Sequence, residues 1–114
     1  MSKTVTRADL QARLTANPAL ILLEALPEKY FNDWHLPRAR LMPHDQTRAL
    51  APGLAPDKAA EIVVYCASDT CQNSHIAARV LQSIGYTDVA VYAGGKKDWS
   101  EAGLPQERGV GVPA

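Results

Sequence analysis

The 114-residue chain has only two cysteines, no net charge and no long apolar run, and each absence excludes a class of protein. Two cysteines are too few for the disulfide framework of a small secreted domain, so in a reducing compartment we expect them to be free, catalytic or redox-active. Lys and Arg number 12 and are balanced by 12 Asp and Glu, so the chain lacks the basic field that drives nucleic-acid binding. We therefore expect no nucleic-acid partner.

Membrane and secretory signals are also missing. No apolar run approaches the roughly 20 residues that cross a bilayer, and the first residues, MSKTVTRADLQ, contain no apolar core of signal-peptide length. We therefore expect a cytoplasmic protein without a membrane partner. The length suits one domain with one core, and we expect that domain over residues 1–106, followed by a C-terminal tail at 107–114.

Short apolar strands alternate with helices along the chain. The patterns predict strands at 19–23, 40–42, 61–65 and 88–92, helices at 7–16, 27–31, 46–50, 74–84 and 96–102, and a proline-rich loop at 51–60. Because no hairpin dipeptide joins the strands, they require crossover connections and a parallel sheet. We predict an α/β fold with a central parallel sheet of about four to five strands and helices on both faces.

The stretch VVYCASDTCQNS, residues 63–74, places Cys66 directly after the segment with the strongest strand pattern. In open α/β sheets, ligands bind at the carboxyl ends of strands. Backbone amides in such a loop can form an anion-binding nest, and the amino terminus of the next helix adds its positive end. Both features lower the pKa of a thiol and favour the nucleophilic thiolate. The alternative is that Cys66 packs in the core, as free cysteines often do.

Four segments in this order resemble the single-domain rhodanese family of sulfurtransferases. The stretch at 21–39 is similar to the family's first strand and its His-Ile-Pro-Gly-Ala motif, and VVYC at 63–66 resembles the strand that delivers the catalytic cysteine. The helix with Ser74 and Leu81, ending at Gly85-Tyr86, resembles the helix after the active loop. The stretch YAGGKKDWSEAGLP at 92–105 resembles the closing signature.

The resemblance implies that Cys66 takes a sulfane sulfur from a donor such as thiosulfate, holds it as a persulfide, and passes it to a thiol or other nucleophile. The partners would be a small sulfur donor and a thiol acceptor, an acceptor protein being one option, and no cofactor is implied. The expected anion-binding loop supplies backbone amides from eight residues: Ala67, Ser68, Asp69, Thr70, Cys71, Gln72, Asn73 and Ser74.

The chain also departs from the family pattern. The loop after Cys66 is about two residues longer, and Asp69 and Cys71 replace a glycine and an arginine that help such loops to hold thiosulfate. This change of charge disfavours an anionic donor, so we expect a different donor or weak thiosulfate turnover. Arg38 stands where the first motif commonly has glycine. The sixth residue after Cys66 is Gln72 rather than the arginine of the related phosphatases, which makes phosphatase activity improbable.

Three other residues near this loop have two interpretations each. Cys71 is either an ordinary loop cysteine or a resolving thiol that forms a disulfide with Cys66. His75 and Lys96 are candidates for the pocket rim, although a solvated side chain is the simpler interpretation of each. A zinc site of Cys66, Cys71 and His75 is disfavoured by the spacing, so we expect no metal.

Two further functions remain open at this point. One is a non-catalytic binding or regulatory module of the same family, in which the cysteine is vestigial. The other is a dithiol redox sensor that uses Cys66 and Cys71. The reactivity of Cys66 distinguishes the transferase from the binding module, because only the transferase needs a nucleophile that carries sulfur. A disulfide between Cys66 and Cys71 after mild peroxide treatment would distinguish the sensor.

Overall fold

A five-stranded sheet forms the centre of the fold. The computed structural model describes residues 3–108. The sheet order is β1-β5-β4-β2-β3, and every neighbouring pair is parallel. The strands are β1 (Lys3–Val5), β2 (Ile21–Glu24), β3 (Ala39–Leu41), β4 (Ile62–Tyr65) and β5 (Val89–Tyr92). This arrangement confirms the predicted parallel α/β sheet.

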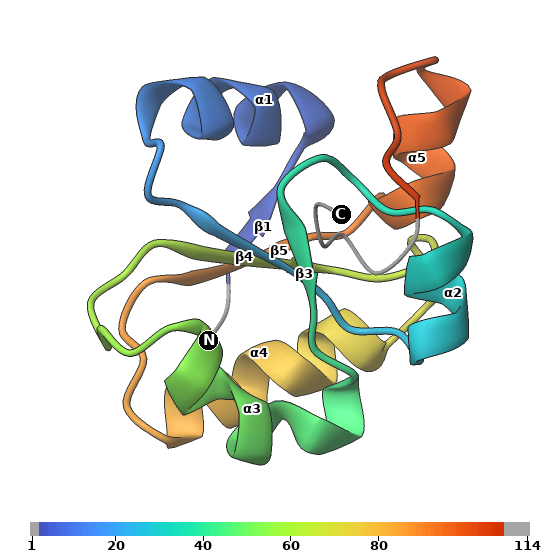
Figure 1. Ribbon diagram of the computed structural model, residues 1–114. Helices are drawn as coiled ribbons and strands as arrows, with labels where there is room; N and C mark the ends of the chain where they lie inside the picture. The colour runs from blue at the N-terminus through green and yellow to red at the C-terminus, as the bar shows by residue number, and fades with distance from the viewer. Residues whose placement is uncertain (1–2, 109–114) are drawn as a thin grey trace.

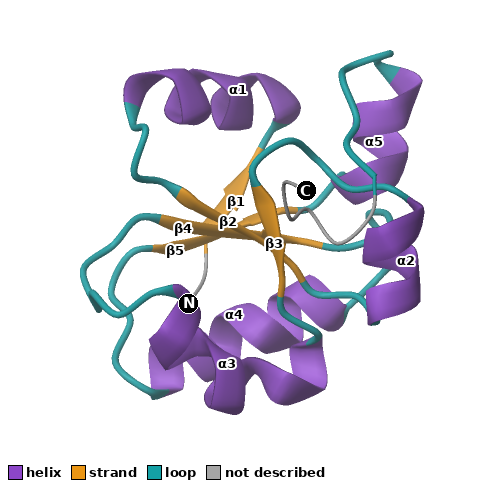
Figure 2. Ribbon diagram, in the orientation of Figure 1, coloured by secondary structure: helices purple, strands orange, loops and turns teal. Residues whose placement is uncertain are grey.

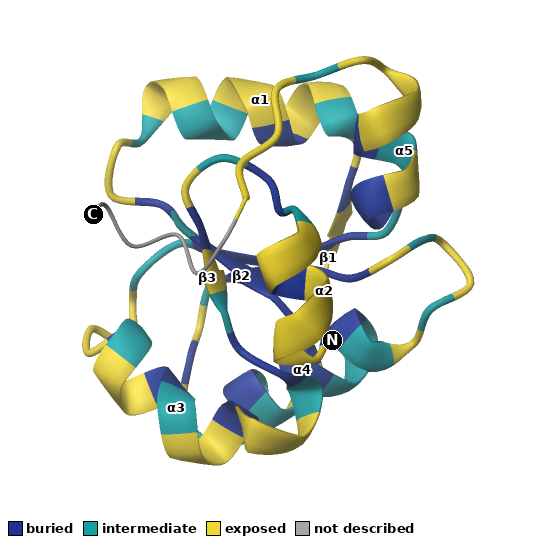
Figure 3. Cartoon of the chain, turned by 45° about the vertical axis from the view of Figure 1, so that its right-hand side comes forward, coloured by how far each residue is buried: buried dark blue, intermediate teal, exposed yellow. Residues whose placement is uncertain are grey.

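Helices cover both faces of the sheet, as Figure 2 shows. One face carries α1 (Arg7–Ala16), α2 (Glu28–Asp33) and α5 (Gly95–Glu101), and the other carries α3 (Thr47–Leu54) and α4 (Asn73–Ser83). A short 3-10 helix, η1 (His44–Gln46), precedes α3. All four residues of β4 are buried, and Figure 3 shows buried strand segments in dark blue at the centre of the molecule.

Alternation along the central strands assigns their side chains to two core clusters. In β4, Val63 and Tyr65 pack with α1, α2 and α5, whereas Ile62 and Val64 pack with α3 and α4. A strand that is apolar on both faces is what a doubly covered parallel sheet requires. The strand predicted at 61–65, whose apolar run covers residues 62–65, therefore matches β4 closely.

Two element predictions were wrong. Strand β1 was not predicted, because it has three residues and only Val5 is buried. The loop predicted at 51–60 is in part helical, because α3 continues through Pro52 to Leu54. Burial of Ala51 and Ala55 holds this last turn, and the Tyr86 hydroxyl donates to the Ala55 carbonyl at 2.6 Å. Tertiary packing here outweighs the low helix propensity of proline.

Arg38 adopts the left-handed backbone conformation that usually requires glycine, with φ of 72°. Its guanidinium donates to the carbonyl oxygens of Leu14, Pro18 and Leu20 at 2.9, 3.0 and 3.1 Å. These are carbonyls at the end of α1 and in the turn that follows it. The side chain therefore compensates for a backbone conformation that costs about 1–2 kcal/mol in a residue other than glycine.

The described chain ends against the loop that follows α2. The backbone N–H of His35 donates to the carbonyl of Glu107 at 2.8 Å, and the N–H of Glu107 donates back at 2.9 Å. Glu107 belongs to the C-terminal tail predicted at 107–114, and residues 109–114 of that tail lie outside the described residues. Residues 1 and 2 of the predicted domain also lie outside them.

Within residues 3–108, no helix has the length and apolar character needed to cross a membrane.

Candidate active site

Cys66 follows β4 at the carboxyl end of the sheet, where the sequence placed it. Its carbonyl oxygen accepts the backbone N–H of Lys96 at 2.9 Å, and the Ala67 carbonyl accepts that of Lys97 at 2.8 Å. Gly95 makes this close approach possible, because a Cβ at Gly95 would overlap the Cys66 carbonyl oxygen and lie 3.0 Å from its carbon. The start of α5 therefore fixes the backbone of Cys66.

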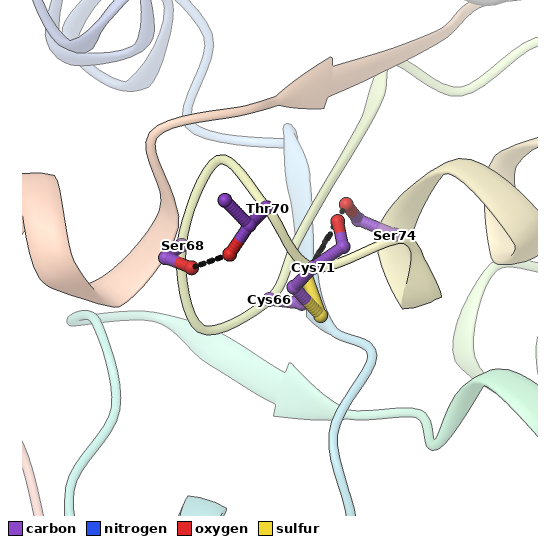
Figure 4. Close-up of a disulfide and its surroundings, with 5 residues drawn as sticks. All are labelled: Cys66, Ser68, Thr70, Cys71 and Ser74. Atoms are coloured by element: carbon purple, nitrogen blue, oxygen red, sulfur yellow. Dashed lines mark hydrogen bonds between the residues drawn. A yellow bond between two sulfur atoms is a disulfide. The ribbon is translucent and has the colours of Figure 1, made fainter.

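A disulfide joins Cys66 to Cys71 (Figure 4). Their Cα atoms are 6.4 Å apart, within the range that a disulfide spans. The loop between them is curled by its own hydrogen bonds, because the N–H of Cys71 donates to the Ser68 carbonyl at 3.1 Å and the hydroxyls of Ser68 and Thr70 lie 3.0 Å apart. The pairing that a resolving thiol requires is present, and the role of Cys71 stays a prediction.

The surroundings of the Cys66 sulfur are polar. The sulfur lies 3.4 Å from the Cys71 carbonyl oxygen and 3.5 Å from the hydroxyl of Ser74, which is buried in the first turn of α4. Cys66 is 1% exposed, whereas Cys71 is partly exposed. Cys66 is thus buried, as the packing alternative expected, but its sulfur lies against hydrogen-bonding groups.

Most backbone amides of the loop have no acceptor within the described chain. Of the amides of residues 67–74, one is engaged among residues 3–108, that of Cys71 with Ser68. The remaining amides, including those of Asn73 and Ser74, carry no hydrogen bond within residues 3–108, as is common for the first turn of a helix. Helix α4 starts at Asn73, one residue before the predicted start.

The two residues expected at the pocket rim occupy different environments. His75 is half-buried in the first turn of α4. Lys96 is largely buried, and its place at the pocket rim stays a prediction. It donates to Glu24 Oε2 at 3.1 Å and to the Tyr30 carbonyl at 2.7 Å, and it lies 5.0 Å from the centre of the Trp34 ring.

Glu24 is the centre of a buried polar network that sequence reasoning missed. The carboxylate is wholly buried at the end of β2, accepts the Tyr65 hydroxyl at 2.7 Å and pairs with Lys96. The Tyr65 oxygen in turn accepts the N–H of Leu36 at 3.2 Å. Tyr65 precedes Cys66 and the Lys96 amide binds the Cys66 carbonyl, so the network supports the cysteine from two sides.

Burial dominates the ionisation of this network. Desolvation raises the pKa of Glu24 above its ordinary value of 4.5, although the Tyr65 hydroxyl and the charge of Lys96 act in the opposite direction. Desolvation likewise lowers the pKa of Lys96, against the effect of Glu24. Burial and the adjacent carboxylate raise the pKa of Tyr65 well above its ordinary value, so this phenol stays a neutral donor.

A cavity of about 500 Å³ lies apart from the disulfide, at the carboxyl ends of β1 and β5. It is lined by residues 4–8 and 92–94 and by Asp98, whose carboxylate accepts the Tyr92 hydroxyl at 2.5 Å and pairs with Arg7 at 3.0 Å. Sequence reasoning did not predict it, since its walls come from opposite ends of the chain. In the part of the chain that the structure describes, no three His, Cys, Asp or Glu side chains are grouped to hold a metal.

Comparisons with known proteins agree with this architecture. A family model described as the rhodanese-like domain matches residues 6–102. The crystal structure of a thiosulfate sulfurtransferase from Pseudomonas aeruginosa is 25% identical, with a TM-score of 0.83 over 95% of this chain and 20% of that one. The chain therefore spans a fifth of the length of that protein. No curated protein matches the chain.

Two smaller structures are similar over most of their own length. The solution NMR structure of a rhodanese-like domain from Anabaena sp. is 28% identical, with a TM-score of 0.82 over 100% of this chain and 86% of that one. The structure of a rhodanese with anions from E. coli is 26% identical, with a TM-score of 0.68 over 80% of this chain and 100% of that one. The predicted fold and family resemblance are confirmed. The chain belongs to the rhodanese-like domain family, a family of sulfurtransferases.

Proposed function

We propose that this protein is a sulfurtransferase or persulfide carrier in which Cys66 is the catalytic nucleophile. The observation that carries the proposal is the position of the Cys66 sulfur, which lies beside the Ser74 hydroxyl at the end of β4, where the following loop has unengaged amides. Family membership supports it, as does the thiosulfate sulfurtransferase among the similar structures.

The proposed reaction starts from the reduced protein. The Cys66 thiolate attacks the outer sulfur of thiosulfate, the sulfur–sulfur bond of the donor breaks, and sulfite leaves with the electron pair. An acceptor thiolate then attacks the outer sulfur of the Cys66 persulfide, and Cys66 leaves as a thiolate. The partners are thus a sulfane-sulfur donor and a thiol acceptor, which includes an acceptor protein as one option.

Two groups act on the charges that this reaction creates. The amides of residues 67–74 bind the anionic donor and the persulfide, as donors directed at developing charge do in acyl transfer. The Ser74 hydroxyl, which lies 3.5 Å from the Cys66 sulfur, would donate to the thiolate. Because Asp69 adds a negative charge to the loop, we expect slower turnover with the dianion thiosulfate than with a persulfide donor of lower negative charge. The similar rhodanese structure from E. coli contains anions, which supports anion binding as a property of this chain as well.

Mass spectrometry tests the proposal. The protein is first reduced and freed of reductant, because the disulfide removes the nucleophile. It is then incubated with thiosulfate, mercaptopyruvate or a small persulfide, with Cys66→Ser as the control. We expect Cys71→Ser, in which no second thiol can act on the persulfide, to gain the mass of one sulfur atom, and Cys66→Ser not to gain it. Equal labelling of both proteins would remove Cys66 from this role.

The disulfide itself favours a second candidate, a dithiol redox sensor. In that case mild peroxide oxidises Cys66 to a sulfenic acid, Cys71 displaces hydroxide from it, and the disulfide forms. A reduced protein that forms the disulfide with peroxide but accepts sulfur from none of the three donors would be a sensor rather than a transferase. Two unmodified thiols after peroxide treatment would exclude the sensor.

A further inference from the structure

The disulfide joins one buried and one partly exposed cysteine. Cys66 is 1% exposed, and Cys71 is partly exposed on the loop. Thiol–disulfide exchange requires that a thiolate reach the sulfur that it attacks. An incoming thiol therefore meets Cys71 first, forms a mixed disulfide there, and releases Cys66 as the thiolate. Reduction in this direction produces the nucleophile that the proposed transferase needs.

The loop holds the second thiol within bonding distance of the first. The two Cα atoms are 6.4 Å apart, and the turn from Ser68 to Cys71 is closed by a backbone hydrogen bond of 3.1 Å. The Cys71 carbonyl also lies 3.4 Å from the Cys66 sulfur, so both the backbone and the side chain of Cys71 face that atom. A sulfur added to Cys66 would therefore form next to a thiol of the same loop.

Resting on the proposed function, we propose that Cys71 releases the transferred sulfur from Cys66 as hydrosulfide. The Cys71 thiolate attacks the inner sulfur of the Cys66 persulfide, and a sulfur–sulfur bond forms between the two side chains. The bond between Cys66 and the outer sulfur breaks, and the outer sulfur leaves with the electron pair and takes up a proton. The sulfane sulfur is reduced by two electrons, and the two cysteines are oxidised to the disulfide.

This step gives the protein a second activity, the dithiol-dependent release of sulfide from sulfane-sulfur donors. A dithiol reductant attacks Cys71, closes to its own disulfide and restores both thiols. One turnover thus converts a sulfane-sulfur donor and a dithiol into the reduced donor product, hydrosulfide and a disulfide. A monothiol acceptor would instead take the outer sulfur directly, so Cys71 and the outside acceptor compete for the same persulfide.

A single-turnover measurement tests this step. Reduced wild type and Cys71→Ser, freed of reductant, are mixed without oxygen with one equivalent of a small persulfide donor, and both hydrosulfide and protein mass are followed. We expect the wild type to release one equivalent of hydrosulfide and lose the mass of two hydrogens. We expect Cys71→Ser to retain one added sulfur. A thiol tethered by a short loop acts at an effective concentration of about 1 mM or more.

The effective concentration of the Cys71 thiol sets the expected difference in hydrosulfide release between the wild type and Cys71→Ser. With dithiothreitol at roughly 0.1 mM, hydrosulfide release should be about tenfold slower or more in Cys71→Ser than in the wild type. Cys71→Ala is a second variant, and circular dichroism of both variants shows whether the fold is retained. Sulfur that stays on Cys66 in the wild type, or equal release rates in all three proteins, would overturn the inference and leave the proposed function in place. If the Cys71 variants gain no sulfur and the wild type releases no hydrosulfide, both the inference and the proposed function are overturned.

Discussion

Replacing Lys96 by methionine tests whether the buried ion pair supports the fold beneath Cys66. Methionine keeps an unbranched apolar stem and removes the ammonium that donates to Glu24 at 3.1 Å and to the Tyr30 carbonyl at 2.7 Å. The wholly buried carboxylate would then keep one hydrogen bond, from Tyr65. Because removing one partner of a buried ion pair costs about 3–5 kcal/mol, we expect the free energy of unfolding to fall by that amount at neutral pH.

The loss should depend on pH. Burial already raises the pKa of Glu24 above 4.5, and the charge of Lys96 acts to lower it, so the variant raises this pKa further. A folded-state pKa above the unfolded value means that the folded protein binds the proton more tightly. Stability then falls as the pH rises from 4.5 through the folded pKa. The cost of Lys96→Met should therefore be largest at neutral pH and smaller near about pH 5.

Urea denaturation followed by the fluorescence of the buried Trp99 measures both effects. Lys97→Met is the matched control, because the neighbouring lysine is exposed and its loss should change stability by less than about 0.5 kcal/mol. Combining Lys96→Met with Glu24→Gln should recover part of the loss, since the amide carries no charge. Equal stability of the two lysine variants, or a loss that does not change with pH, would refute the reasoning.

Three further predictions concern the backbone and the thiol. Gly95→Ala should lower the free energy of unfolding, measured in urea, by about 2–5 kcal/mol. Residue 95 has a φ of 62°, and the added Cβ would overlap the Cys66 backbone. Gly53 has open space around it in α3, so Gly53→Ala should raise the free energy of unfolding by about 0.5–1 kcal/mol. Equal effects of the two glycine substitutions would contradict this reasoning. Arg38→Ala and Arg38→Gly lose the same hydrogen bonds, but only glycine adopts the left-handed conformation without strain. The alanine variant should therefore be less stable by about 1 kcal/mol. A less stable glycine variant would show that residue 38 is not strained. Ser74→Ala should slow the transfer of sulfur to Cys66 about fivefold, because one hydrogen bond contributes about 1 kcal/mol. An unchanged rate would show that the hydroxyl has no part in the mechanism.

The parts of the fold that were predictable have local signals. Strands β4 and β5 consist of β-branched and aromatic residues with one alanine and are buried on both faces, so composition alone located them within a residue. Helix α1 was placed at its observed bounds because Thr6 caps it, with its side chain accepting the Asp9 amide at 3.1 Å. The end of α3 was missed because its stability comes from Tyr86, which is distant in sequence.

In the candidate site too, features with a local sequence signal were predictable, and features that depend on distant residues were not. The position of Cys66 after the central strand followed from the sequence, since a strand and its carboxyl end can be located locally. The partner of Lys96 could not be found in this way, because Glu24 lies 72 residues away and most lysines are solvated. The spacing of Cys66 and Cys71 allowed a disulfide, but the turn that brings them together depends on hydrogen bonds within the loop, which residue types alone do not specify.

The antiparallel contact between His35 and Glu107 has a practical consequence for shortened versions of the protein. His35 is wholly buried, so water does not readily replace Glu107 as the partner of its N–H and carbonyl groups. A buried backbone group without a partner costs about 1–3 kcal/mol. Truncation after Gln106 would therefore leave two such groups next to α2, whereas a version that keeps Glu107 retains both hydrogen bonds. Domain dissection and fusion designs should accordingly place their junction beyond this residue.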